Sequence, residues 1–309
     1  WHPGSYDPAT GLYYAPVQDM ANLMFVPPGP NTYQPKGLNT DAALIFSPDL
    51  EAALPTLPPP LAAAVEALPA YAEVKRKPYS SELRALDPLT GKTKWAVPMK
   101  GWQDRGGVLT TASGLVFQGS IDGYFNVYDK ASGKLLKSID TGTSMLAAPM
   151  TYRVAGVQYV AVMAAWGGGG FPYVPRYSAA YARGNAGRLL VFKLGGTAKL
   201  PEPGPLNLPP LDPPALTGTP EQVADGAKNF GQFCGVCHGD SAIGSGVTRD
   251  LRRAGSLGDA KLWNQIVIGG ALAQNGMISW KEELNDQQAE NLRQYVIKRA
   301  QEDKALGMK

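Results

Sequence analysis

The sequence predicts a protein of two parts, an all-β portion of repeated four-stranded units followed by a smaller all-α domain. Three observations indicate this. The first 197 residues are rich in Gly, Tyr and Thr and hold short β-type runs separated by turn residues. A turn sequence recurs from Asp87 to Asp129, an offset of 42 residues that matches one blade of a β-propeller. After a proline-rich stretch, apolar residues recur at helical spacing on both sides of a Cys-x-x-Cys-His sequence.

Length and composition limit the possible classes of protein. A chain of 309 residues suggests about two domains, and a hydrophobic share of 44% is that of a folded protein. The formal charge of +3 is too small to indicate nucleic acid, and no apolar run reaches membrane-spanning length. We therefore expect neither a nucleic-acid partner nor a membrane span. Because the chain starts at Trp1, without methionine or a signal peptide, we expect a mature product, a fragment or one chain of a larger assembly.

The repeated turn explains the β portion. In Asp87-x-x-Thr90-Gly91-Lys92, the Asp and Thr side chains can bond nearby backbone groups, and Gly supplies a positive φ. The second copy runs from Asp129 to Lys134, and a weaker third copy begins at Asp7. Trp95 follows the first copy and is predicted to pack between blades. The expected strands are residues 108–119, 124–128, 158–163 and 188–194, and residues 48–71 are expected to leave the sheet, with a short helix over 62–68.

Cys234-Gly-Val-Cys237-His238 is the attachment signature of c-type haem, in which the two thiols anchor the ring and the histidine ligates iron. The chain has only two cysteines and two histidines, and three of these four residues lie in this window. A closed zinc site would need a further ligand pair, and a thioredoxin-like pair would need a βαβ context. A short-loop disulfide would leave His238 unexplained.

Met277 is the candidate sixth ligand of the iron. It follows Gly276 in a Gly/Asn-rich turn between two helical segments, and Met opposite His is a known haem ligand pair. The alternative for any methionine is packing in a core. The only other methionine of this domain is Met308, at the tail.

The helices around the motif fit a small cytochrome. Thr219 and Pro220 predict the start of one helix, and Asn285 predicts the start of the last one. The last helix is expected to bury one face, formed by Ala289, Leu292, Val296 and Ala300. The stretch resembles class I cytochromes c, whose terminal helices cross at positions that correspond to Gly226, Phe230, Leu292 and Tyr295 here. Ile278 departs from the family, which commonly has proline after the methionine.

The β portion resembles the C-terminal half of the pyrroloquinoline-quinone dehydrogenases, which are eight-bladed propellers with a tryptophan docking motif. The similar segments stand in family order and are residues 1–16, 105–119, 149–152, 158–162 and 187–196. With the haem domain, the likeness narrows to quinohaemoprotein alcohol dehydrogenases. It implies propeller blades over 1–197, a proline-rich linker over 198–217 and a cytochrome c domain over 218–309. The linker is expected to be a stiff extended spacer, with a passive tether as the open alternative.

The resemblance also implies a site for pyrroloquinoline quinone and Ca²⁺ that residues outside this chain complete. No residue of this chain is assigned as the catalytic base. Trp166 and Gly167 lie where the family approaches the quinone, although Trp166 as a blade-packing residue is equally compatible. Arg105 is placed to pair a quinone carboxylate, unless Asp104 neutralises it. Trp102 and Trp1 are further candidates at the rim.

The implied function is the oxidation of an alcohol in the periplasm, with electrons passing through the haem to an external acceptor such as a small redox protein. The implied partner is the missing N-terminal propeller half or a companion chain. Two alternatives stay open. One is a non-enzymatic electron carrier with a β docking domain, and the other is a dehydrogenase of amines, sugars or polymeric alcohols.

Overall fold

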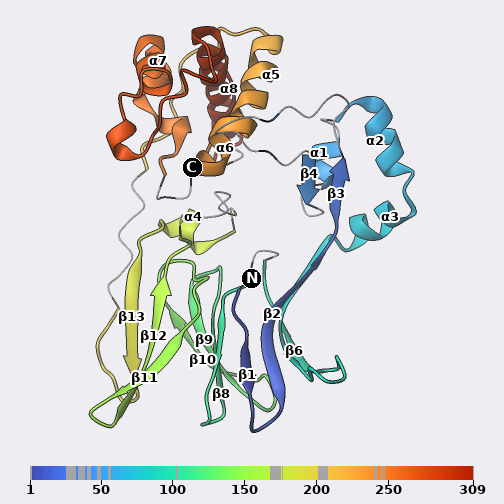
Figure 1. The fold of residues 1–309 in the computed structure, drawn as a ribbon, viewed down its shortest axis with the longest axis vertical. Helices are drawn as coiled ribbons and strands as arrows, with labels where there is room; N and C mark the ends of the chain where they lie inside the picture. The colour runs from blue at the N-terminus through green and yellow to red at the C-terminus, as the bar shows by residue number, and fades with distance from the viewer. Residues whose placement is uncertain are drawn as a thin grey trace. The chain divides into compact units, whose positions relative to one another are not determined.

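The structure is a computed structural model of the chain (Figure 1). It describes residues 2–25, 33, 39, 43–46, 50–54, 57–101, 104–167, 175, 177–200, 208–239, 242–244, 246 and 248–308. These residues form two compact units. Unit 1 holds the described residues up to Trp166 together with those from 175 to 200, and unit 2 holds Gly167 and the described residues from 208 onward. Among the helices in these ranges, none is both long and apolar enough to cross a membrane.

Among its described residues, unit 1 contains three antiparallel sheets of three or four strands, called blades here, and one two-stranded sheet. Blade 1 has the order β1 (Ser5–Asp7), β2 (Leu12–Met20), β5 (Tyr79–Leu86), β6 (Thr93–Pro98). Blade 2 has β7 (Val108–Thr110), β8 (Leu115–Gly119), β9 (Tyr124–Asp129), β10 (Leu135–Asp140). Blade 3 has β11 (Met150–Val154), β12 (Val157–Ala164), β13 (Arg188–Lys193). The expected strand over 108–119 is thus two strands, because Gly114 turns the chain with a φ of 88°.

The blades bury their facing sides against one another. In β5, Ser81, Leu83 and Ala85 are buried and alternate with partly exposed residues, as a strand between two layers should. One core between blades 1 and 2 contains Tyr14, Leu83, Ala85, Val108, Val116 and Tyr128. A second, between blades 2 and 3, contains Phe117, Phe125, Met145, Val162, Ala164 and Leu190.

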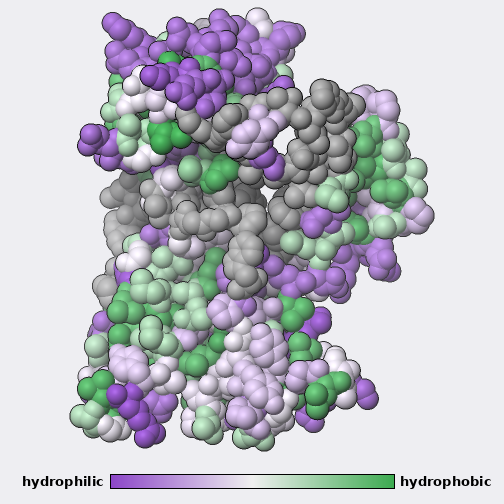
Figure 2. All heavy atoms as spheres, viewed as in Figure 1, coloured by the Kyte–Doolittle hydropathy of each residue, from purple (hydrophilic) through white to green (hydrophobic). Residues whose placement is uncertain are grey.

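The outer face of blade 3 is apolar and exposed. Its exposed side chains come from all three strands and include Met150, Tyr152, Val154, Val157, Met163, Leu189 and Val191. Figure 2 shows hydrophobic surface over this part of unit 1. Apolar surface of this extent usually marks an interface.

The repeated turns adopt the predicted conformation. Gly11, Gly91 and Gly133 have φ values of 71°, 69° and 73°. The Thr90 hydroxyl donates to the Asp87 carboxylate at 2.8 Å, and the third turn has the same bond at 2.9 Å. These side-chain bonds hold the chain in a tight turn at one end of each hairpin.

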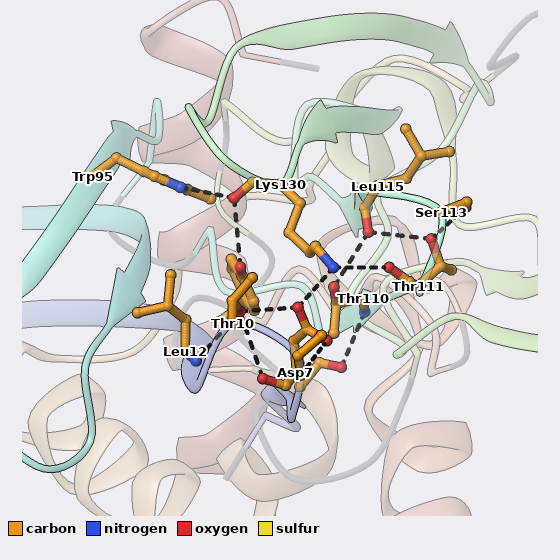
Figure 3. A network of polar contacts seen from close by, with 12 residues as sticks. Asp7, Thr10, Leu12, Trp95, Thr110, Thr111, Ser113, Leu115 and Lys130 are labelled. Carbon is orange, nitrogen blue, oxygen red and sulfur yellow. Dashed lines mark hydrogen bonds and ion pairs between the residues drawn. The ribbon is translucent and has the colours of Figure 1, made fainter.

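Trp95 joins blade 1 to blade 2, as the sequence predicts. Its indole Nε1 donates to the Lys130 carbonyl at 3.0 Å, and its ring lies so close to Gly133 that an added Cβ there would come within 2.7 Å. The Lys130 Nζ pairs with the Asp7 carboxylate at 2.6 Å, and both side chains are buried (Figure 3). The turns that begin at Asp7 and Asp129 therefore also provide contacts between blades 1 and 2.

Replacing Trp95 with alanine is expected to lower the free energy of unfolding of unit 1 by about 2–4 kcal/mol, because it removes a partly buried ring that packs on Gly133. Trp95→Phe keeps an aromatic ring, although a smaller one, and loses the bond to Lys130, so its cost should be about 1–2 kcal/mol and lower than that of Trp95→Ala. Urea unfolding of the full chain, followed by the β-sheet circular dichroism signal, measures both values. Lys94→Ala, at an exposed neighbouring position, is the control. A Trp95→Ala chain as stable as the control would contradict the docking role.

A helical excursion separates β2 from β5. It contains β3 (Asn22–Phe25), β4 (Ala43–Phe46), α1 (Leu50–Ala53), α2 (Pro59–Glu66) and α3 (Pro69–Arg76). Leu50, Leu54 and Val65 form its own small apolar cluster. The expected short helix over 62–68 exists as α2, but it starts earlier because Pro59 occupies its first position.

Unit 2 is helical. Its helices are α5 (Pro220–Asn229), α6 (Gly235–His238), α7 (Ala260–Val267) and α8 (Asp286–Ala305). Short turns of other helix types are η2 (Phe230–Cys234), η3 (Leu251–Arg253), η4 (Gly255–Gly258) and η5 (Ala273–Asn275). Thr219 and Asn285 begin α5 and α8 with capping boxes, completed by Gln222 and Gln288.

The crossing of α5 with α8 is confirmed. A Cβ added to Gly226 would lie 2.0 Å from the Asn291 carbonyl oxygen, so only glycine allows this approach. The rings of Phe230 and Tyr295 are 5.1 Å apart. The predicted face of α8, formed by Ala289, Leu292, Val296 and Ala300, is buried.

Residues 208–218 lie along α8. Gln294 accepts from the amides of Thr217 and Gly218, and Gln301 donates to the Pro214 carbonyl at 2.8 Å. Leu211 is 4% exposed. This half of the proline-rich stretch therefore packs on the helices of unit 2, and the stiff spacer stays a prediction.

Candidate functional site

The Cys-x-x-Cys-His sequence occupies the end of the first helical segment of unit 2. Helix α5 widens into the π-helical turn η2, and α6 then carries Cys237 and His238. Gly239 ends the segment with a φ of 76°. Cys234 is buried and Cys237 is exposed, and both are free thiols. Burial raises the pKa of the Cys234 thiol to about 12, so this sulfur is protonated at neutral pH.

His238 is held by the loop that follows it. Its Nδ1 lies 3.4 Å from the Arg249 carbonyl oxygen, which leaves Nε2 for another ligand. The Gly244 amide donates to the His238 carbonyl at 2.8 Å, and the Thr248 hydroxyl donates to the Cys237 carbonyl at 2.6 Å. Burial lowers the pKa of His238, which favours the neutral imidazole that a metal requires.

Met277 lies in the turn that the sequence predicts. Gly276 before it adopts a φ of 91°, and the Met277 amide donates to the Leu272 carbonyl at 3.2 Å. Its side chain packs against the apolar cluster that also contains Cys234. The buried members of this cluster are Phe230, Cys234, Ala242, Leu257, Trp263, Val267, Trp280, Leu284, Ala289, Leu292, Val296 and Ile297.

These residues fit a haem. The buried thiol of Cys234 and the partly buried thioether of Met277 both border one aromatic-rich apolar core, which suits an apolar macrocycle. Within the described ranges, no three His, Cys, Asp or Glu side chains gather as a metal ligand set, so a closed zinc site has no such cluster there.

The second candidate region is the end of unit 1 opposite the repeated turns. Because neighbouring strands are antiparallel, the described residues 99–101, 104–107, 120–123, 141–149, 165–166 and 177–187 lie on connections that leave the strands at this common end. The connections are tied together by buried hydroxyls. Ser144 donates to the Ile121 carbonyl and accepts from the amide of Ala180 in α4 (Ala179–Arg183), and Thr143 donates to the Gly184 carbonyl.

Asp104 is a buried acid within this region. Its side chain is 2% exposed and accepts from the Ile121 amide at 2.9 Å. Burial, followed by the charge of the nearby Asp122 carboxylate, raises the pKa of Asp104 to about 7. Asp104 thus bonds the backbone of a neighbouring connection.

Arg105 turns toward Gln18 instead, with Nη1 3.4 Å from Oε1. Burial lowers the pKa of Arg105. His2 lies on the same unit, where its Nδ1 is 3.4 Å from the Leu146 carbonyl oxygen, and burial and then the charge of Arg105 lower its pKa. Sequence reasoning missed His2 and Gln18. The one available signal was that His2 is the only histidine outside the haem motif.

The remaining residues expected near the quinone are placed as follows. Trp166 is 7% exposed, and its amide donates to the Asn185 side chain at 2.7 Å. Gly167 has a φ of 82°. Trp166 and Arg105 lie on two different connections at the same end of the sheets. Trp102 and Trp1 lie outside the described residues.

The raised pKa of Asp104 predicts a pH-dependent stability. Between the unfolded value of 3.8 and the folded value of about 7, the folded chain holds a proton that the unfolded chain has lost. The free energy of unfolding should therefore fall as pH rises through this window, by at most roughly 4 kcal/mol, and stay level above it. Asp104→Asn keeps an acceptor for the Ile121 amide and should remove the fall. Urea midpoints at pH 5 and pH 8 test this, and Asp19→Asn, at an exposed position of β2, is the control. Equal pH slopes for Asp104→Asn and the unaltered chain would contradict the assignment.

Comparison with known proteins identifies the family. Residues 1–160, about half of the chain, match the PQQ family described as glucose/ethanol/alcohol dehydrogenase, β-propeller domain. The chain belongs to this family. Residues 221–296 of this PQQ-family chain match a second family, described as cytochrome c oxidase, cbb3-type, subunit III. Propeller blades followed by a helical cytochrome c domain are thereby confirmed.

Three relatives each align with most of this chain. Quinohemoprotein alcohol dehydrogenase ADH IIB of Pseudomonas putida is 35% identical over 305 residues, which cover 98% of this chain and 40% of the relative. Lupanine 17-hydroxylase (cytochrome c) of a Pseudomonas species is 37% identical over 224 residues, which cover 71% of this chain and 31% of the relative. The solved structure of quinohemoprotein alcohol dehydrogenase ADHIIG from Pseudomonas putida HK5 matches with a TM-score of 0.79 and 32% identity, covering 98% and 41%. The PQQ-family chain thus spans about 40% of the length of ADH IIB.

Proposed function

We propose that the chain forms the C-terminal part of a quinohaemoprotein dehydrogenase that oxidises alcohols. The observation that carries this proposal is the presence, in one chain, of a PQQ-family propeller match and a helical unit with a Cys-x-x-Cys-His segment. Pyrroloquinoline quinone, when bound, would supply the two-electron oxidation of an alcohol to an aldehyde or ketone, and haem c would supply one-electron transfer. The domain bounds we propose are 1–197, 198–217 and 218–309.

In the haem domain, we assign covalent attachment to Cys234 and Cys237 and iron ligation to His238 and Met277. The buried Cys234 and the packing of Met277 on the same core support this assignment. The Arg249 carbonyl accepts from Nδ1 of His238, which leaves Nε2 as the nitrogen that would ligate the iron.

At the quinone end, Trp166, Gly167, Arg105 and Trp102 are the proposed contacts. Trp166 and Arg105 lie on two connections at the same end of the sheets, and this placement supports their assignment as quinone contacts. The general base and the ligands of Ca²⁺ would come from a further part of the propeller, outside the 40% of ADH IIB that this sequence matches. That part, on the same polypeptide or on a companion chain, is the proposed partner.

Covalent haem attachment implies export, so we propose a periplasmic location and an external electron acceptor such as a small redox protein. Two other functions are alternatives that experiments should distinguish from this proposal. An electron carrier with a β docking unit would bind no quinone. A different substrate class also has support, because one relative is named as a lupanine hydroxylase rather than an alcohol dehydrogenase.

Haem attachment tests the proposal directly. When the chain is produced with a cytochrome c maturation system, we expect haem that stays bound on a denaturing gel and a c-type pyridine haemochrome spectrum. Cys234→Ala and Cys237→Ala should each remove one covalent bond and shift that spectrum, and the double variant should lose all gel-stable haem. The control is Val236→Ala, between the two cysteines. Gel-stable haem in the double variant would refute the assignment.

A further inference from the structure

A buried ion cluster lies between α8 and the loop that follows the haem motif. Arg252 in η3 and Asp303 in α8 are each 1% exposed. Arg252 donates to the Asp303 carboxylate through Nη1 at 2.8 Å, and to both Asp250 carboxylate oxygens through Nε and Nη2 at 2.9 and 2.7 Å. The planar guanidinium thus bridges two acids that are 53 positions apart in the chain (250 and 303).

Two further arginines extend this cluster. Arg253 pairs with Asp250 and donates through Nε to the Pro209 carbonyl at 2.9 Å. Arg299 lies 3.5 Å from Asp303. Three segments, η3, α8 and the extended residues 208–218, are therefore joined at one point.

Stability alone is a weak reason for such a cluster. Removing charges from water is costly, and well-packed apolar residues are often at least as stabilising as a buried ion pair. What the cluster provides is a defined geometry. The Arg252 amide also donates to Asp250, at 3.1 Å, so the backbone is fixed where η3 begins. The residue just before Asp250 is Arg249, whose carbonyl faces the His238 ring.

We propose that the Asp250, Arg252 and Asp303 cluster positions the Arg249 carbonyl and thereby orients His238. A carbonyl that accepts from Nδ1 fixes the tautomer and the rotation of the ring and makes the opposite nitrogen a better ligand. The inference rests on the proposed function in taking His238 as the iron ligand. The three charged residues are positioning residues, since they act through the Arg249 backbone.

The test is the exchange rate of the His238 Nδ1 proton in the full chain. Labelling with ¹⁵N-histidine gives only two side chains to assign, and His2 is the internal reference. Arg252→Lys keeps the charge and loses the planar fork, and should speed exchange of this proton roughly three- to tenfold, the equivalent of a weakened hydrogen bond. Asp303→Asn should act in the same direction. The matched control is Arg293→Lys, because Arg293 is also on α8 but bonds Glu290 and the Leu257 carbonyl.

An unchanged Nδ1 proton in both cluster variants would overturn the inference. So would an equal acceleration for the buried amide of Ile297, because loosening of the whole unit would then explain the effect. The haem spectrum is recorded separately. A chain that carries no haem refutes the proposed function. The exchange rates test the positioning role separately, because they report on the hydrogen bond between His238 and the Arg249 carbonyl.

Discussion

Met277→Ala is expected to abolish the methionine-to-iron band at the red end of the oxidised haem spectrum and to lower the reduction potential by on the order of a hundred millivolts. The reason is that a thioether ligand favours ferrous iron, and removing it leaves the position to water or to a stronger donor. In the structure, the Met277 side chain borders the same core as Cys234, which places it within the haem domain and not at its surface rim. Absorbance spectroscopy during a redox titration measures both quantities.

Met308→Ala is the matched control, since it removes the other methionine of unit 2, which lies three residues beyond the end of α8. Its spectrum and potential should equal those of the unaltered chain. If Met277→Ala also keeps the band and the potential, Met277 is a core residue and another side chain ligates the iron.

The haem should be reduced by alcohol only when the rest of the propeller is supplied together with quinone and Ca²⁺. The blades described here carry no assigned general base, and the chain spans about 40% of the length of ADH IIB. The exposed apolar face of blade 3 gives the additional part a surface to cover. Stopped-flow haem absorbance should show no alcohol-driven change for the chain with added quinone and Ca²⁺, and a fast phase for the completed assembly.

Dithionite should reduce the haem in both samples and so provides the control for intact haem. Fast alcohol-driven reduction in the chain alone would mean that a base within it suffices. Asp104, with its raised pKa, would then be the first residue to replace.

Sequence reasoning predicted well wherever the determining residues are neighbours in the chain. The Asp-x-x-Thr-Gly turns have the expected positive φ, because the side-chain bonds that make them span three positions. Thr219 and Asn285 begin their helices for the same reason, since a capping box is complete within four residues. The glycine at position 226 was recognisable only through the resemblance to cytochromes, because its partner Asn291 lies far along the chain.

The sequence by itself determined the class of each part and the identity of the candidate haem ligands, because a five-residue motif, a repeat and helical periodicity are local patterns. Tertiary structure alone decided what those elements contact. It selected the Lys130 carbonyl and Gly133 as partners of Trp95, turned Asp104 to the Ile121 amide instead of a side chain, and laid residues 208–218 along α8. It also brought Arg252 to Asp303, across 51 positions. Such pairs form only when packing excludes water from both partners, and no local pattern in the sequence encodes which distant group will be there.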